Sequence, residues 1–98
     1  MIKLFDELTE QDKKRFLEDT KRKYEEQYGV PWDFVERQIQ RFIDSAYDKE
    51  LFEQMSSDDK KDAIYMKKKF PDKKPSIAEH VLWASTFVTG SEYVEIPD

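Results

Sequence analysis

Few residues of this chain are of a type that does chemistry: it has one histidine, His80, many acids and no cysteine. Acids that lie close together in lysine-rich surroundings include Glu25, Glu26, Asp58, Asp59 and Asp62. Paired catalytic carboxylates need burial and a fixed separation, whereas these acids stand among lysines at solvent positions of expected helices. His80 has neither a second histidine nor a cysteine with which to hold a metal. We therefore expect a protein that is not an enzyme and binds neither a metal nor a cofactor.

One basic segment is the candidate for nucleic-acid binding. Residues 63–75 carry five lysines against the single acid Asp72. The lysines are Lys67, Lys68, Lys69, Lys73 and Lys74. Successive side chains of a helix point about 100° apart, so the triplet surrounds the helix end instead of forming one stripe. A helix C-terminus also repels phosphate, which makes a solvated helix end the simpler interpretation.

The element that positions the rest is the most apolar stretch, residues 77–88. Ser76 and Glu79 have the spacing of a capping box, and Gly90 is a typical stop signal. Apolar side chains occupy most of the helix circumference, which predicts a central helix covered on most sides. His80 falls on the covered arc, either as a hydrogen-bonded structural residue or as a group that responds to pH or contacts a ligand.

The other segments predict further helices. Thr9 is a candidate N-cap for a helix that ends near Tyr28 and Gly29, and Pro31 opens an amphipathic helix. Asp48 and one of the serines at 56 and 57 are candidate caps of two shorter helices. The prediction is an all-α fold: a compact bundle of four to five helices around a buried C-terminal helix (about 77–88). Residues 1–98 form one domain, with an N-terminal arm (1–8) and an extended acidic tail (90–98).

Phe34 does not belong to the apolar stripe of its helix. It lies on the polar side, near Arg37 and Arg41. An exposed aromatic residue beside arginines is typical of a binding hot spot. The alternative is that Phe34 packs under the N-terminal arm or the end of the preceding helix.

The C-terminal tail alternates β-branched or aromatic residues with acids. Its candidate partner-binding residues are Glu92, Tyr93 and Glu95. An extended acidic segment of this kind either lies along its own domain or adds to a partner as a strand or peptide.

Composition limits the class of protein. Charged residues make up 40% and hydrophobic residues 38%, but the 14% aromatic content supports a small folded core. The formal net charge of −5 disfavours sequence-independent nucleic-acid binding, which depends on Lys and Arg. The N-terminus shows no signal peptide and no stretch is long enough to span a membrane, so we expect a cytoplasmic protein.

These observations favour a small acidic module that binds another protein with a basic surface. In type, such chains resemble bacterial or phage accessory proteins, including inhibitors of host nucleic-acid machinery, whose clefts are basic. The alternatives are a nucleic-acid-associated regulator that uses Lys67 to Lys74, and a structural subunit that associates with itself.

Overall fold

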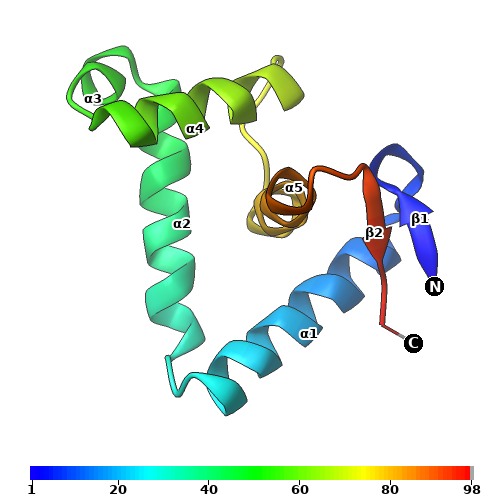
Figure 1. The fold of residues 1–98 in the computed structure, drawn as a ribbon. Coiled ribbons are helices and arrows are strands. Elements are labelled where there is room, and N and C mark those ends of the chain that lie inside the picture. The colour runs from blue at the N-terminus through cyan, green and yellow to red at the C-terminus, as the bar shows by residue number, and fades with distance from the viewer. Residues whose placement is uncertain (98) are drawn as a thin grey trace.

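The computed structural model describes residues 1–97 and confirms the all-α bundle (Figure 1). In chain order its elements are β1 (Ile2–Leu4), the short 3-10 helix η1 (Phe5–Glu7), α1 (Glu10–Gln27), α2 (Trp32–Tyr47), α3 (Lys49–Glu53), α4 (Ser57–Lys69), α5 (Ile77–Thr89) and β2 (Tyr93–Glu95). Within the described part of the chain, no helix is both long and apolar enough to cross a membrane.

Local side-chain caps define where the two main helices start. The Thr9 hydroxyl accepts a hydrogen bond from the Asp12 N–H at 3.1 Å, and the Asp12 carboxylate accepts one from the Thr9 N–H. Ser76 and Glu79 form the same reciprocal pair at the start of α5. Both are capping boxes, which satisfy backbone donors that a helix start leaves free. The predicted starts of α1 and α5 are therefore confirmed.

The remaining boundaries also follow local signals. Asp48 caps α3 and Ser56 caps α4 through their side chains. Gly29 and Gly90 adopt φ angles of 64° and 70°, a left-handed conformation that glycine reaches without steric cost. Pro31 is the N-cap of α2, one position earlier than the first-turn position expected from the sequence.

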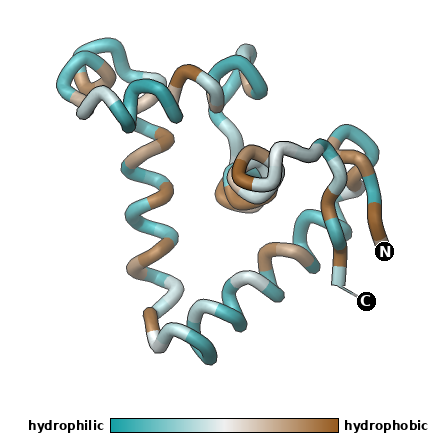
Figure 2. The backbone as a smooth tube through the Cα atoms, viewed as in Figure 1, coloured by the Kyte–Doolittle hydropathy of each residue, from teal (hydrophilic) through white to brown (hydrophobic). Residues whose placement is uncertain are grey.

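Three helices form the body of the molecule. α1 and α2 diverge from the turn at Gly29, and α5 packs against both of them (Figure 1). α3 and α4 cover the far end of α2, where the Tyr47 hydroxyl donates a hydrogen bond of 2.8 Å to the Phe70 carbonyl. Figure 2 shows α1 as mostly hydrophilic, and its apolar residues, such as Phe16, are only partly buried against the core.

The core combines residues of α2, α4 and α5 with residues of both terminal segments. Its buried hydrophobic residues form one cluster: Phe5, Ile43, Ala46, Ala63, Met66, Leu82, Trp83, Val94 and Ile96. Four of them, Ile43, Ala63, Met66 and Leu82, have no exposed surface. Helices too polar to be stable alone are therefore held by shared burial.

The N-terminal arm and the C-terminal tail form a two-stranded antiparallel ribbon. Lys3 pairs with Val94, and Met1 and Ile96 exchange backbone hydrogen bonds of 3.2 and 2.7 Å. Val94 and Ile96 lie in the core, so the tail packs on its own domain, one of the two alternatives that the sequence left open. Asp98, the last residue of the predicted tail, lies outside the described residues.

The central helix α5 is covered less completely than its composition indicates. Leu82 and Trp83 are buried, but Phe87 is 43% exposed and Val88 is 84% exposed. A valine exposed to this extent in the most apolar helix is the main difference from the sequence-based expectation. The last three residues of α5, Phe87 to Thr89, are all exposed.

Candidate protein-binding groove

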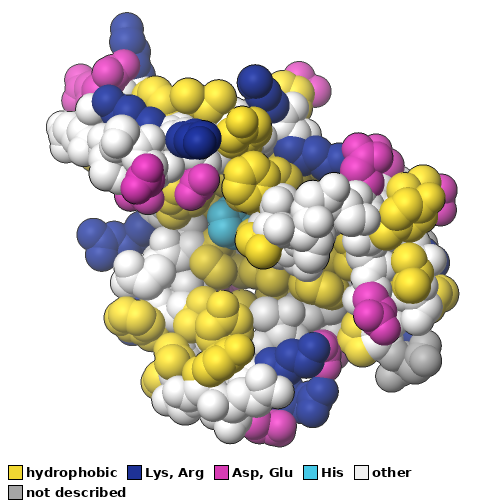
Figure 3. All heavy atoms as spheres, in the orientation of Figure 1, with side chains coloured by type: hydrophobic (Ala, Val, Ile, Leu, Met, Phe, Trp, Pro, Cys, Tyr) yellow, Lys and Arg dark blue, Asp and Glu magenta, His cyan; other side chains and the backbone are white. Residues whose placement is uncertain are grey.

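An apolar groove lies between α1, α2 and α5, and we call it the groove. It has a volume of about 530 Å³. Its lining comprises Phe16, Thr20 and Tyr24 of α1; Trp32, Val35 and Ile39 of α2; and His80, Val81, Ala84, Ser85, Val88 and Thr89 of α5. Figure 3 shows the histidine beside a hollow whose walls are largely hydrophobic side chains. The groove contains no charged lining residue, because each helix turns its apolar stripe toward it.

His80 is the principal polar side chain of the groove wall. Its ring lies between Phe42 and Trp83, with centroid distances of 5.8 and 5.7 Å. Its Nδ1 atom is buried and has no hydrogen-bond partner among the described residues. Burial lowers the pKa of His80 because the charged imidazolium loses its hydration there. The histidine is therefore part of an aromatic wall, and it favours the neutral form.

The aromatic wall continues along α5 to the molecular surface. Trp83 stacks on Phe87 at 5.2 Å, and Phe87 contacts Tyr65 of α4 at the same distance. Tyr65 and Phe87 are both about two-fifths exposed, and Val88 follows Phe87 in sequence. Apolar surface thus extends from the groove over the end of α5.

A second recess adjoins the groove on the side of the tail. It shares Phe16, Thr20 and Ser85 with the groove and adds the charged residues Asp19, Lys23 and Glu95. The Asp19 carboxylate accepts hydrogen bonds from Arg22 at 2.6 Å and from Lys23 at 3.0 Å, and these bonds lower the pKa of its carboxyl group. In the described part of the chain, Glu95 has no ion-pair partner. The free charge on this side of the groove is therefore negative.

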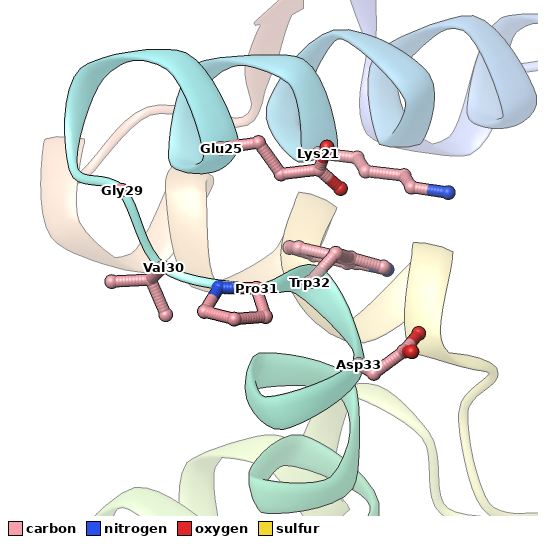
Figure 4. A pocket seen from close by; sticks show the side chains of 7 residues that line it. All are labelled: Lys21, Glu25, Gly29, Val30, Pro31, Trp32 and Asp33. Atoms are coloured by element: carbon pink, nitrogen blue, oxygen red, sulfur yellow. The ribbon is translucent and has the colours of Figure 1, made fainter.

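A more polar recess lies at the turn between α1 and α2. Figure 4 shows Lys21 and Glu25 extending from α1 over Trp32, with Val30 and Pro31 below them. Its charges have opposite sign and lie at the surface. Trp32 also lines the groove, so the buried indole separates the two sites.

The three predicted residues of α2 lie at the surface. Phe34 is 52% exposed, and Arg37 and Arg41 are exposed as well. The Arg37 side chain donates a hydrogen bond of 3.3 Å to the Asp33 carbonyl of its own helix. Phe34 therefore does not pack under the arm, and its role as a contact residue stays a prediction.

The three predicted tail residues are also exposed. Tyr93 has 61% of its surface accessible, and Glu92 and Glu95 are exposed on either side of it. Tyr93 and Glu95 alternate with Val94 and Ile96, which face the core. Strand alternation thus presents Tyr93 and Glu95 to solvent while it anchors the tail. Of the predicted partner-binding residues, only Glu95 lies beside the groove.

The lysines of the basic segment make contacts within the domain. Lys67 lies 3.8 Å from the centre of the Phe52 ring, Lys68 lies 5.6 Å from that of Tyr65, and Lys69 lies 4.3 Å from that of Phe5. Lys69 also pairs with Asp6, and Lys74 pairs with Asp44, each at 3.2 Å. Burial raises the pKa of Glu79, but its hydrogen bonds with Ser76 lower it on balance, and the charges of Lys13 and then Lys73 add to that lowering. The segment is divided among several partners and does not form a single basic stripe.

Other chemistry finds no support in the described residues. They contain no cluster of three or more histidine, cysteine or acidic side chains able to hold a metal ion. Sequence reasoning missed the groove because it assigned the apolar residues of α5 to the core. The signal that pointed to it was the nearly complete apolar circumference of α5, which few neighbours in a small domain are able to cover.

Comparisons with known proteins found no match. No family model fits the sequence, no curated protein matches it, and no solved structure matches the fold.

Proposed function

We propose that this chain is a non-enzymatic module that binds another protein, and that the partner places apolar side chains in the groove. The observation that carries the proposal is Val88, which is 84% exposed at the edge of an apolar groove of about 530 Å³. Covering such a surface removes apolar area from water and is favourable.

A basic partner surface fits the charge of the module. The net charge is −5, and residues 76–98 contain four acids but no lysine or arginine. Opposite charge accelerates encounter and orients the two surfaces, while buried apolar anchors hold them together. The specific form of this hypothesis is an accessory protein that inhibits nucleic-acid machinery by binding a basic protein surface.

Affinity capture from the organism that carries the gene tests the proposal. The tagged chain is compared with Val88→Gln, which makes the groove edge polar, and with Leu51→Gln as a matched control. Leu51 is 45% exposed on α3 and does not line the groove. We expect wild type and Leu51→Gln to recover the same partner, identified by mass spectrometry, and Val88→Gln to recover much less of it.

The double variant Phe34→Ala/Arg41→Ala tests the predicted surface of α2 in the same assay. Unchanged recovery would show that this surface takes no part in binding. If no variant and no wild-type sample captures a protein, the proposed function is wrong.

Self-association is the second candidate function. Ile64, Tyr65, Phe87 and Val88 are each at least 42% exposed, and a second copy is one way to cover them. Sedimentation over a wide concentration range distinguishes the two: the binding module stays monomeric, and a structural subunit forms a dimer or larger assembly.

A further inference from the structure

We infer that the groove and the tail form one composite site for a basic amphipathic segment of a partner protein. The segment's apolar side chains fill the groove, and its lysine or arginine side chains reach Glu95. This inference rests on the proposed protein-binding function and names the chemistry of the partner segment.

The shape of the groove favours a helical segment. Val81, Ala84, Ser85 and Val88 follow the spacing i, i+3, i+4, i+7 on α5, and all four line the groove. Side chains at this spacing form one continuous strip along a helix. The strip is small in the middle, where Ala84 and Ser85 stand, and aromatic or branched side chains of α1 and α2 form the walls. Such a surface accepts large apolar anchors of the kind that amphipathic helices present at matching intervals.

The charge beside the groove determines which sign of charge the partner segment must carry next to its apolar side chains. Glu95 lines the adjoining recess and has no ion-pair partner among the described residues. The basic residue among the lining residues of that recess, Lys23, is paired with Asp19 at 3.0 Å. On α5 itself, the Glu79 carboxylate is occupied by its capping box and by Lys13 at 3.7 Å. The charge left free at this edge is the carboxylate of Glu95, which attracts lysine and arginine.

His80 contributes to the apolar character of the site. Its neutral ring lies between Phe42 and Trp83, so the wall that an apolar anchor meets carries no charge. Because it is the only histidine of the chain, its ring signals report directly on occupation of the groove.

Two synthetic helical peptides with the same leucine face test the inference on the full chain. One carries lysine at the remaining positions and the other carries glutamate. We expect the lysine peptide to bind, to shift the NMR signals of His80, Val88 and the Trp32 indole, and to bind more weakly as salt increases. We expect the glutamate peptide to bind at least tenfold more weakly.

Variants assign the two parts of the site. Glu95→Gln should weaken binding of the lysine peptide by about twofold to fivefold, as expected for the loss of an exposed ion pair, and should slightly strengthen binding of the glutamate peptide by removing a like charge. Glu53→Gln, an exposed acid on α3, is the matched control and should change nothing. Val88→Gln should weaken binding of the lysine peptide more strongly than Glu95→Gln does.

The outcomes that overturn the inference are distinct. Equal binding of both peptides would show that the site does not distinguish positive from negative peptides. Binding that leaves the groove signals unmoved would place the peptide elsewhere on the acidic surface. A dimer whose interface covers the groove would make a second copy the occupant. If neither peptide binds while Val88→Gln still abolishes capture of a partner, the proposed function survives and this inference fails.

Discussion

Lys3 of the first strand and Asp12 of α1 form an ion pair with an Nζ–Oδ2 distance of 2.7 Å. Asp12 is also the acid of the capping box with Thr9, and it is the buried charged residue of the described chain. The Asp12 carboxylate therefore caps the N-terminus of α1 and also binds the two-stranded ribbon to that helix. The hydrogen bond from Lys3 lowers the pKa of Asp12 to about 2, with the bond from the Thr9 backbone as the next contribution.

This ion pair predicts a specific loss of stability in acid. A carboxyl group whose pKa is lower in the folded state stabilises the fold above its unfolded pKa of about 3.9. That contribution disappears as the pH falls through about 4 toward 2. In Lys3→Met the folded pKa of Asp12 rises, so we expect lower stability at pH 7 and a smaller further loss between pH 4 and 2. Denaturant unfolding followed by tryptophan fluorescence at each pH measures both effects. Lys14 is an exposed lysine of α1, and the control variant Lys14→Met should behave as wild type.

We expect truncation of Met66 and of Ile64, both in α4, to reduce stability to very different extents. Met66 has no exposed surface, whereas Ile64 is 45% exposed two positions earlier. We expect Met66→Ala to reduce the free energy of unfolding by about 2–5 kcal/mol, because it removes contacts and leaves a cavity. Ile64→Ala should cost about 1 kcal/mol or less. Equal losses in urea unfolding would contradict the position of α4 over the core.

His80 predicts a second pH dependence, in the neutral range. Burial lowers its pKa in the folded state, while the unfolded chain titrates near 6.5. As the pH falls below about 6.5, the unfolded state takes up a proton before the folded state does, so stability decreases until the folded pKa is reached. NMR titration of the single histidine should give a pKa below about 6.5 in the native protein and the ordinary value in urea. His80→Phe should remove this part of the pH dependence.

The lysines of the basic segment predict weak binding to nucleic acid. Because Lys67, Lys68 and Lys69 lie over three different rings, they do not form one continuous surface for phosphate groups. Fluorescence anisotropy at low salt should detect little binding of duplex DNA or single-stranded RNA. Tight binding whose logarithm falls steeply with the logarithm of salt would instead support the regulator hypothesis. The triple variant with methionine at these three positions would then abolish it.

The starts and ends of the helices could be predicted because their signals are local. A capping box such as Ser76 with Glu79 joins residues three positions apart, and Gly90 acts through its own φ angle. These preferences are present in a short segment before any tertiary contact forms.

Packing between distant segments decided the rest. The composition of the tail predicts an extended segment. Its pairing with β1 depends on residues such as Lys3 and Val94, which are 91 positions apart and meet only when the helices have packed. The apolar pattern of α5 predicts that the helix is largely buried, but not which of its sides the neighbouring helices cover. That depends on how α1 and α2 diverge and on the space their side chains fill, which the periodicity of one helix does not contain. The sequence by itself therefore determined the helices and their ends, and only the tertiary structure left Val88 and the groove open.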